Sequence, residues 1–133
     1  MIPRYLTVDL ILKSRENLSP IADFLGDRVF LLWNETLHDI RSLGIETTLD
    51  FSKGPEDDLV EILRLLKTLT PELIDLFDRC SERIVDIGFE SGSSGDPIDA
   101  TIRAGIVKEL AKFQIAINIR VYAVPPPSVM PSS

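Results

Sequence analysis

The chain has 133 residues, of which 44% are hydrophobic and 26% are charged, and its formal net charge is −7. That length and hydrophobic fraction exclude an unfolded, solvated chain and allow one domain that buries its own core without a disulfide. The acidity disfavours binding to nucleic acid or to an anionic membrane and suits a basic protein partner, although solubility alone also accounts for it.

The first third of the chain has the pattern strand, helix, strand. Alternation over Tyr5–Lys13 predicts a strand with one buried face. Ser19-Pro20 is expected to open a short helix that ends at Gly26, and Arg28–Trp33 is expected to be the second strand. Residues 34–44 are expected to form a loop. The side chains predicted on the buried face of the first strand are Leu6, Val8, Leu10 and Leu12.

The middle of the chain predicts a further strand, Ile45–Phe51, and two helices that each begin with a proline. The first helix begins at Pro55, and the second is Pro71–Cys80. The three acids that follow Pro55 fit the positive end of the helix dipole. The single cysteine, Cys80, has no second thiol to pair with and is expected to be a packed, structural residue.

The apolar stripe of the first of these helices is wide. It spans more than one side of the helix, so either the second helix or another subunit is expected to cover the remainder. Because two-fold pairing is the commonest use of such a surface, the sequence predicts a homodimer. The predicted interface residues are Leu59, Ile62, Leu65, Leu66 and Leu69, together with neighbours such as Val60.

The last third again has the pattern strand, helix, strand. The predicted elements are the strand Arg83–Glu90, the helix Pro97–Phe113 and the strand Ile115–Val124. Gly105 inside the helix predicts a close backbone approach. Residues 125–133, rich in proline and serine, are expected to be a disordered tail. The side chains expected to face the core from the last strand are Ile115, Ile117, Ile119 and Val121.

These elements predict an α+β fold in a single domain of residues 1–124. One-faced strands need helices on only one side, and crossover connections are right-handed. The simplest arrangement is a ferredoxin-like α/β sandwich of two βαβ units, 5–33 and 83–124, with residues 55–80 as a helical insertion between them.

The polar registers of these strands give the candidate binding residues. Side chains opposite the apolar registers would form one polar patch if their strands are neighbours, flanked by Tyr5 and Trp33. The patch is either a binding surface or a solvated face held by cross-strand ion pairs, and the helical insertion could also fold over it. The predicted binding residues are Asp9, Trp33, Asp86, Asn118, Arg120 and Tyr122, and Thr7 lies in the same register.

Motifs for catalysis, metals or cofactors are weak. His38 is the only histidine and is expected to be a solvated loop residue. Residues 91–96 lie between a strand and a predicted helix start, but they lack the lysine of a P-loop and the dinucleotide fingerprint. No catalytic residue, metal ligand or cofactor is therefore predicted. If the protein is an enzyme, Asp86 is the candidate base.

Short segments at both ends of the chain carry a resemblance: Leu6–Leu10, Leu18–Pro20 and Phe24–Gly26 near the start, and Ala111–Phe113 and Ile117–Tyr122 near the end. They resemble bacterial families of small, acidic α/β proteins of unknown function, some of which resemble immunity proteins that block a partner toxin. The resemblance implies a non-enzymatic binding protein and transfers no site residue. The sequence thus predicts a protein-interaction module, with a small-ligand or regulatory domain as the alternative and an enzyme as the third. The absence of a signal-peptide pattern and of a long apolar run predicts a cytoplasmic location.

Overall fold

The computed structural model describes residues 2–49 and 52–123, and it has an α+β fold with one mixed sheet and four α-helices. The predicted tail, 125–133, and the end of the predicted strand, Asp50 and Phe51, lie outside the described residues. The elements in chain order are β1 (Arg4–Ser14), α1 (Ser19–Leu25), a 3₁₀ turn (Gly26–Arg28), β2 (Val29–Leu37), β3 (Ile40–Thr47), α2 (Pro55–Leu66), α3 (Pro71–Asp78), β4 (Glu82–Glu90), α4 (Ala104–Lys112) and β5 (Ala116–Tyr122).

The five strands lie in the order β2-β3-β1-β4-β5. β1 pairs antiparallel with both β3 and β4, β2 pairs antiparallel with β3, and β5 pairs parallel with β4. The predicted second unit, β4–α4–β5, therefore has neighbouring parallel strands. The strands of the predicted first unit, β1 and β2, also run parallel, but they are not neighbours because β3 lies between them.

A hairpin replaces the loop predicted at residues 34–44. β2 continues to Leu37 and β3 begins at Ile40, so only His38 and Asp39 connect them. Both connecting residues have positive φ, 51° and 64°, which is the conformation of the two-residue turns whose twist matches that of paired strands. The prediction was wrong here because a His-Asp turn lacks the glycine that normally signals such a hairpin.

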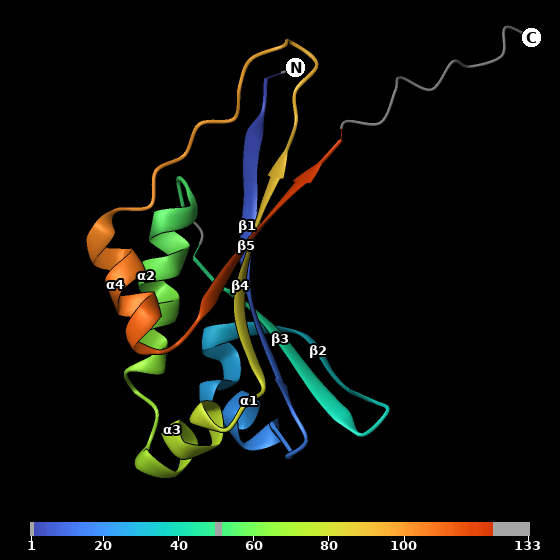
Figure 1. The fold of residues 1–133 in the computed structure, drawn as a ribbon, viewed down its shortest axis with the longest axis vertical. Coiled ribbons are helices and arrows are strands. Elements are labelled where there is room, and N and C mark those ends of the chain that lie inside the picture. Colours follow the sequence, from blue (N-terminus) through green and yellow to red (C-terminus); the bar gives the residue numbers. More distant parts are fainter. Residues whose placement is uncertain (1, 50–51, 124–133) are drawn as a thin grey trace, which may run out of the picture.

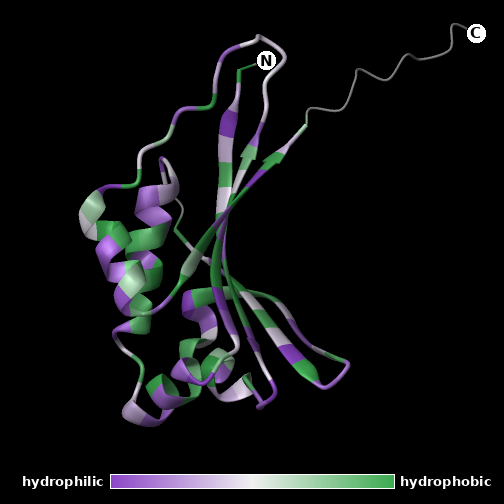
Figure 2. Cartoon of the chain, viewed as in Figure 1, coloured by the Kyte–Doolittle hydropathy of each residue, from purple (hydrophilic) through white to green (hydrophobic). Residues whose placement is uncertain are grey.

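All four helices lie on one side of the sheet (Figure 1). The core forms between them and the sheet, where Val8, Leu10 and Leu12 of β1 are fully buried. The alternating residues of β1 point to the other side, which no helix covers in the described part of the chain. Figure 2 shows hydrophobic and hydrophilic residues interleaved along the strands, as this division of the sheet into a covered face and an open face requires.

An irregularity in β1 changes the side to which its first residues point. The register between β1 and β4 shifts between Tyr5 and Thr7. As a result Leu6, predicted to be in the core, is 37% exposed, whereas Tyr5 packs against the core. Tyr5 therefore does not flank the open-face patch as expected, because a bulge interrupts the two-residue alternation.

The five residues predicted as a dimer interface on α2 are buried within the chain itself. Their exposed fractions are 8% or less, because α2 lies against β1 and β3 on one side and against α4 on another. The chain's own elements therefore account for the width of the apolar stripe, and of its members only Val60 is largely exposed, at 52%. The buried residues are Leu59, Ile62, Leu65, Leu66 and Leu69.

The helix predicted from Pro97 begins seven residues later, at Ala104. Residues 91–103 instead run from the end of β4 to the helix layer without helical structure (Figure 1). The start of α4 is fixed by Glu56 on α2, whose Oε2 accepts a hydrogen bond from the Arg103 backbone N–H at 2.9 Å. Gly105 marks no close approach, because a Cβ added there would meet no atom within 4 Å.

The last strand is exposed on both sides. Ile117, Ile119 and Val121 lie on the helix side of the sheet, yet they are 40%, 63% and 51% exposed. The prediction that they face the core was correct about the side and wrong about burial, because α4 packs on α2 and leaves β5 uncovered. Only Ile115, just before the strand, is buried, at 6%.

Among the described residues, no helix is both long enough and apolar enough to span a membrane.

Candidate functional site on the open sheet face

The open face of the sheet carries a row of polar side chains that crosses four strands. In the strand registers, Asp9 of β1 is paired with Glu46 of β3 on one side and with Asp86 of β4 on the other. Asp86 is paired in turn with Asn118 of β5. Paired residues in neighbouring strands point to the same face, so three carboxylates and one amide lie side by side.

A hollow of about 480 Å³ lies on this face. All six residues predicted from the sequence as binding residues line it, although they come from four strands: Asp9, Trp33, Asp86, Asn118, Arg120 and Tyr122. The strand order explains this, because β1, β4 and β5 are consecutive neighbours and Trp33 of β2 reaches inward over β3.

Asp9 is the least satisfied carboxylate of the site. Its Oδ1 is buried and has no hydrogen-bond partner among the described residues. Burial raises the pKa of Asp9 to about 6, and the neighbouring charges of Glu46 and Asp86 add to the shift, while a hydrogen bond from Thr7 and the charge of Arg120 oppose it. A carboxylate in this state gains from any cation that reaches it.

Asp86, in contrast, is buried and has a partner at each carboxylate oxygen. It is 8% exposed, and its Oδ1 accepts a hydrogen bond from Asn118 Nδ2 at 2.7 Å. Its Oδ2 lies 3.7 Å from Arg120 Nη2. A catalytic base needs a lone pair directed at substrate, and both oxygens of Asp86 are instead engaged by Asn118 and Arg120, so Asp86 is not the unpaired carboxylate that this role would require.

Arg120 keeps much of its surface in solvent while it contacts the site. Its side chain is 55% exposed although it pairs with Asp86. Tyr122 and then Asp86 raise the pKa of Arg120 above its already high value, so the guanidinium is charged under all ordinary conditions.

Two aromatic side chains wall the hollow, and each lies over a glycine. The indole of Trp33 covers Gly44, where an added Cβ would come within 2.5 Å of the ring, and its Nε1 donates to Ser42 Oγ at 2.9 Å. Tyr122 similarly covers Gly88, where an added Cβ would lie 3.6 Å from the ring. The absence of a side chain at Gly44 leaves room for the inward turn of Trp33, whereas a Cβ at residue 88 would be in ordinary van der Waals contact with Tyr122.

The charges lining the hollow do not balance. Four carboxylates and two basic groups line it, and two of the carboxylates are used in ion pairs, Lys13–Glu82 at 3.4 Å and Arg120–Asp86. Asp9 and Glu35 have no ion-pair partner in the described part of the chain. The hollow therefore has surplus negative charge between aromatic walls, an arrangement that favours cations.

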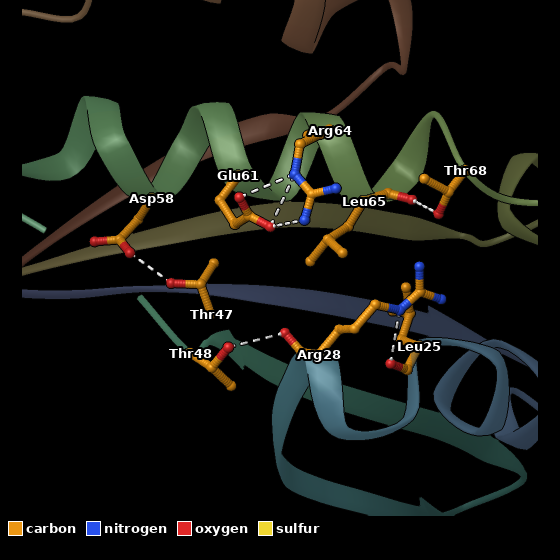
Figure 3. Close-up of polar contacts among 9 residues, drawn as sticks. All are labelled: Leu25, Arg28, Thr47, Thr48, Asp58, Glu61, Arg64, Leu65 and Thr68. Atoms are coloured by element: carbon orange, nitrogen blue, oxygen red, sulfur yellow. Dashed lines mark hydrogen bonds and ion pairs between the residues drawn. The ribbon is translucent and has the colours of Figure 1, made fainter. Parts of the chain in front are cut away.

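A second polar cluster, centred on Asp58, lies on the helix side and was not predicted. Asp58 of α2 is 5% exposed and accepts hydrogen bonds from the hydroxyl groups of Tyr5, Thr47 (2.5 Å) and Ser52 (2.6 Å). Figure 3 shows Asp58 directed at Thr47 at the end of β3. Burial, and then the Asp58 carboxylate, raise the pKa of the Tyr5 hydroxyl.

This cluster changes the interpretation of the acidic run after Pro55. The helix dipole was expected to account for all three acids, but each has a separate partner. Glu56 binds Arg103, Asp57 Oδ2 accepts the Lys53 backbone N–H at 2.8 Å, and Asp58 holds the hydroxyl cluster. The cluster ties the start of α2 to β1 and β3 and uses three of the roughly four lone-pair directions of the Asp58 carboxylate.

The remaining sequence candidates lie apart from the open-face hollow or at its margin. His38 is at the hairpin turn, and no group of three metal-ligating side chains exists among the described residues. The loop after β4 does not lead directly into a helix, since α4 begins at Ala104, so the geometry of a phosphate-binding loop is absent there. Cys80 is buried, and burial raises the pKa of its thiol to about 11.

No protein-family model, curated protein or solved structure matches this chain.

Proposed function

We propose that this protein is a non-catalytic protein-interaction module that binds a partner protein through the open face of its sheet. The observation that carries the proposal is the hollow with surplus negative charge between Trp33 and Tyr122. A partner that presents a lysine or arginine side chain would satisfy the unpaired Asp9 oxygen and could stack on either ring. The net charge of −7 would also steer a basic partner toward the molecule.

The partner and the setting follow from the resemblance noted in the sequence. An immunity-type inhibitor blocks its partner by covering a functional surface, and a sheet face that carries a hollow and that no helix covers among the described residues fits that task. We place the interaction in the cytoplasm, where a chain with a single, buried cysteine needs no disulfide for its stability.

The test uses a charge reversal at the hollow and a matched reversal elsewhere. Wild-type protein, Glu35→Lys and Asp23→Lys are immobilised and exposed to a lysate of the native host. Asp23 is an exposed residue of α1, on the helix side, so it gives the same change of charge away from the hollow. We expect one specific protein to bind wild type and Asp23→Lys, to bind Glu35→Lys at least about tenfold more weakly, and to dissociate as salt rises. A captured protein that binds both variants equally well would contradict the proposal.

A small ligand is the second candidate, favoured by the size of the hollow. Its volume of about 480 Å³ is within the range of ligand pockets, and the exposed guanidinium of Arg120 could hold a carboxylate or phosphate. A thermal-shift screen of small anions and cations distinguishes the two candidates. A compound that raises the melting temperature of wild type but not of Arg120→Met would favour the ligand, and no shift with any compound would count against it.

We also propose that β1, α1, β2, β3, α2, α3 and β4 form a ferredoxin-like unit. The support is that β1 lies between β3 and β4 with β2 beyond β3, and that the helices lie on one face, as in split βαβ folds. In this view residues 55–80 are the second crossover of the unit, and α4 with β5 is an addition at its β4 edge. An experimental structure with a different strand order would contradict the assignment.

A further inference from the structure

In the described part of the chain, the free edge of β5 has few of the features that normally protect an edge strand. All seven residues of β5 are exposed, and the pairing with β4 runs without a bulge. The strand has no proline, lysine or acidic residue, and its one charge is Arg120. Such edges pair readily with another strand unless the sequence prevents it. The opposite edge, β2, has a register shift between Leu31 and Trp33 and an exposed acid, Glu35.

β5 also leaves an apolar stripe uncovered on the helix side. Ile117, Ile119 and Val121 are 40%, 63% and 51% exposed there, beside the buried Val85, Ile87 and Phe89 of β4. The stripe therefore extends the apolar face of the sheet from β4 to β5, beyond the area that the helices cover. A neighbouring strand that adds its own apolar side chains on the same side would extend this face and cover the stripe.

We propose that the occupant of this edge is β5 of a second copy, paired antiparallel about a two-fold axis at Ile119. In this register Ile119 faces its own equivalent, Ile117 faces Val121, Asn118 faces Arg120 and Ala116 faces Tyr122. Apolar residues meet on the helix side and polar residues meet on the open face, and no two like charges are opposed. The strand is thus complementary to itself, as a two-fold contact requires.

Other registers are less favourable. A slip of one residue would pair the apolar residues of one strand with the polar residues of the other. A shift of the pairing toward the end of the strand places Arg120 opposite Arg120 of the second copy, and like charges directly opposed are destabilising. The opposite shift avoids this clash but leaves the two residues at the end of β5 without partners. Only the register centred on Ile119 pairs all seven residues.

Charge also favours a second copy. The proposed register places the guanidinium of the second copy's Arg120 beside Asn118, which donates to Asp86 Oδ1. The second copy would thus add a positive charge next to the row of acids on the open face. Because both helix layers would lie on the same side, the dimer would have one continuous ten-stranded sheet with both hollows on its open face.

The first experiment measures the mass in solution by sedimentation across the micromolar range. We expect wild type to be dimeric and Ile119→Lys, which places two lysines face to face at the axis, to raise the dissociation constant by about tenfold or more. Leu37→Lys is the matched control, since Leu37 is 67% exposed on the other edge strand. It should leave the dimer unchanged. Because Ile119 is 63% exposed, its replacement should leave the melting temperature of the monomer nearly unchanged.

The second experiment tests the register. Under mild oxidation Ile119→Cys should form a covalent dimer and Leu37→Cys should not, while the native Cys80 is too deeply buried to compete. Dimerisation should strengthen with salt, because screening reduces the repulsion between two chains of net charge −7. A monomeric wild type, or a dimer that Ile119→Lys leaves intact, would overturn the proposal. The salt response also separates this contact from the binding of a basic partner, which salt weakens.

Discussion

Asp58 and Asp9 are both removed from water, but they differ in whether their carboxylate oxygens have hydrogen-bond partners. Asp58 accepts hydrogen bonds from three hydroxyl groups, so its desolvation is offset by partners on β1, on β3 and in the segment before α2. Asp9 has an oxygen with no partner among the described residues and two acidic neighbours. The first arrangement stabilises the fold, and the second costs stability, as is common at binding sites.

The raised pKa of Asp9 makes stability depend on pH. Burial and the adjacent acids raise it from 3.8 to about 6, so the folded state holds the proton more strongly than the unfolded state. The resulting stabilisation is present below pH 3.8 and is lost as pH rises to about 6. We expect Asp9→Asn to gain about 1 kcal/mol over wild type at pH 7, a value reduced for solvent screening because Asp9 is only half-buried. Urea denaturation at pH 4 and pH 7 measures this, and an equal effect of the substitution at both values would show that Asp9 has an ordinary pKa.

Variants of two neighbouring acids of α2, Asp57 and Asp58, separate the contribution of hydrogen bonding to stability from that of the helix dipole. Asp58→Ala removes the acceptor of three hydroxyl groups and should lower the free energy of unfolding by about 2–3 kcal/mol. Asp57→Ala removes the same charge from the same helical turn, but it loses only an exposed cap and should cost about 0.5–1 kcal/mol. Chemical denaturation of both variants gives the comparison. Equal losses would mean that the dipole alone explains the acidic run.

At the scale of the elements, a glycine on an inner strand determines where an aromatic ring of the edge strand can lie. Gly44 allows Trp33 to turn inward over the sheet and so build one wall of the hollow, and Tyr122 of β5 builds the other. Gly105, in contrast, lies in the first turn of α4 with open space around it. A glycine in the sequence can thus mark either a close approach or open space, and only the position of its neighbours in the fold shows which.

A pair of alanine substitutions tests this difference. Gly44→Ala forces the Trp33 indole off the sheet and breaks its hydrogen bond to Ser42, so we expect a loss of about 1–3 kcal/mol. Gly105→Ala should instead gain up to about 1 kcal/mol, because alanine favours the helix. Trp33 is the only tryptophan, so its fluorescence reports the displacement directly. An unchanged emission spectrum in Gly44→Ala would show that the indole does not lie over residue 44.

The elements that the sequence predicted well have local signals. The helices that begin at Ser19-Pro20, Pro55 and Pro71 were all predicted from a proline that follows a cap or a break, because proline fits the first helical turn. The same signal was wrong at Pro97, where residues 96–103 bridge from β4 to the helix layer and Glu56 sets the start of α4. That contact joins residues far apart in sequence, so no local pattern contains it.

The candidate site was also predicted in part, and again from a local pattern. Two-residue alternation placed Asp9, Asp86, Asn118 and Arg120 on one side of their strands, and this needs no knowledge of the strand order. Glu35 and Glu46 are not predicted as site residues, because residues 34–44 carry no hairpin signal and the pairing of β3 with β1 cannot be derived from the sequence. The acidity of the site emerges only when the strands are placed side by side.

For the whole molecule, the strand order predicts a gradient of stability across the sheet. β1 has a partner on both sides and its inward side chains are fully buried, whereas β2 and β5 each have one free edge. We expect backbone amide exchange to be slowest in β1 and fastest in β2 and, at low protein concentration, in β5. Hydrogen exchange followed by mass spectrometry or NMR measures this. Protection of β5 that rises with protein concentration, without a change in β2, would agree with the two-fold contact, and fast exchange in β1 would contradict the strand order.

The central position of β1 has a consequence for how the chain is made. β1 leaves the ribosome before the other strands of the sheet, but its second neighbour, β4, begins only at Glu82. Until then one edge of β1 has no partner, even after β3 has paired with the other. A nascent or prematurely ended chain that stops before β4 therefore presents an open and strongly apolar strand, which is the kind of species that chaperones retain and that aggregates without them. A chain that lacks only β5 would still have β1 enclosed, so the damage caused by a truncation depends on whether it falls before or after Glu90.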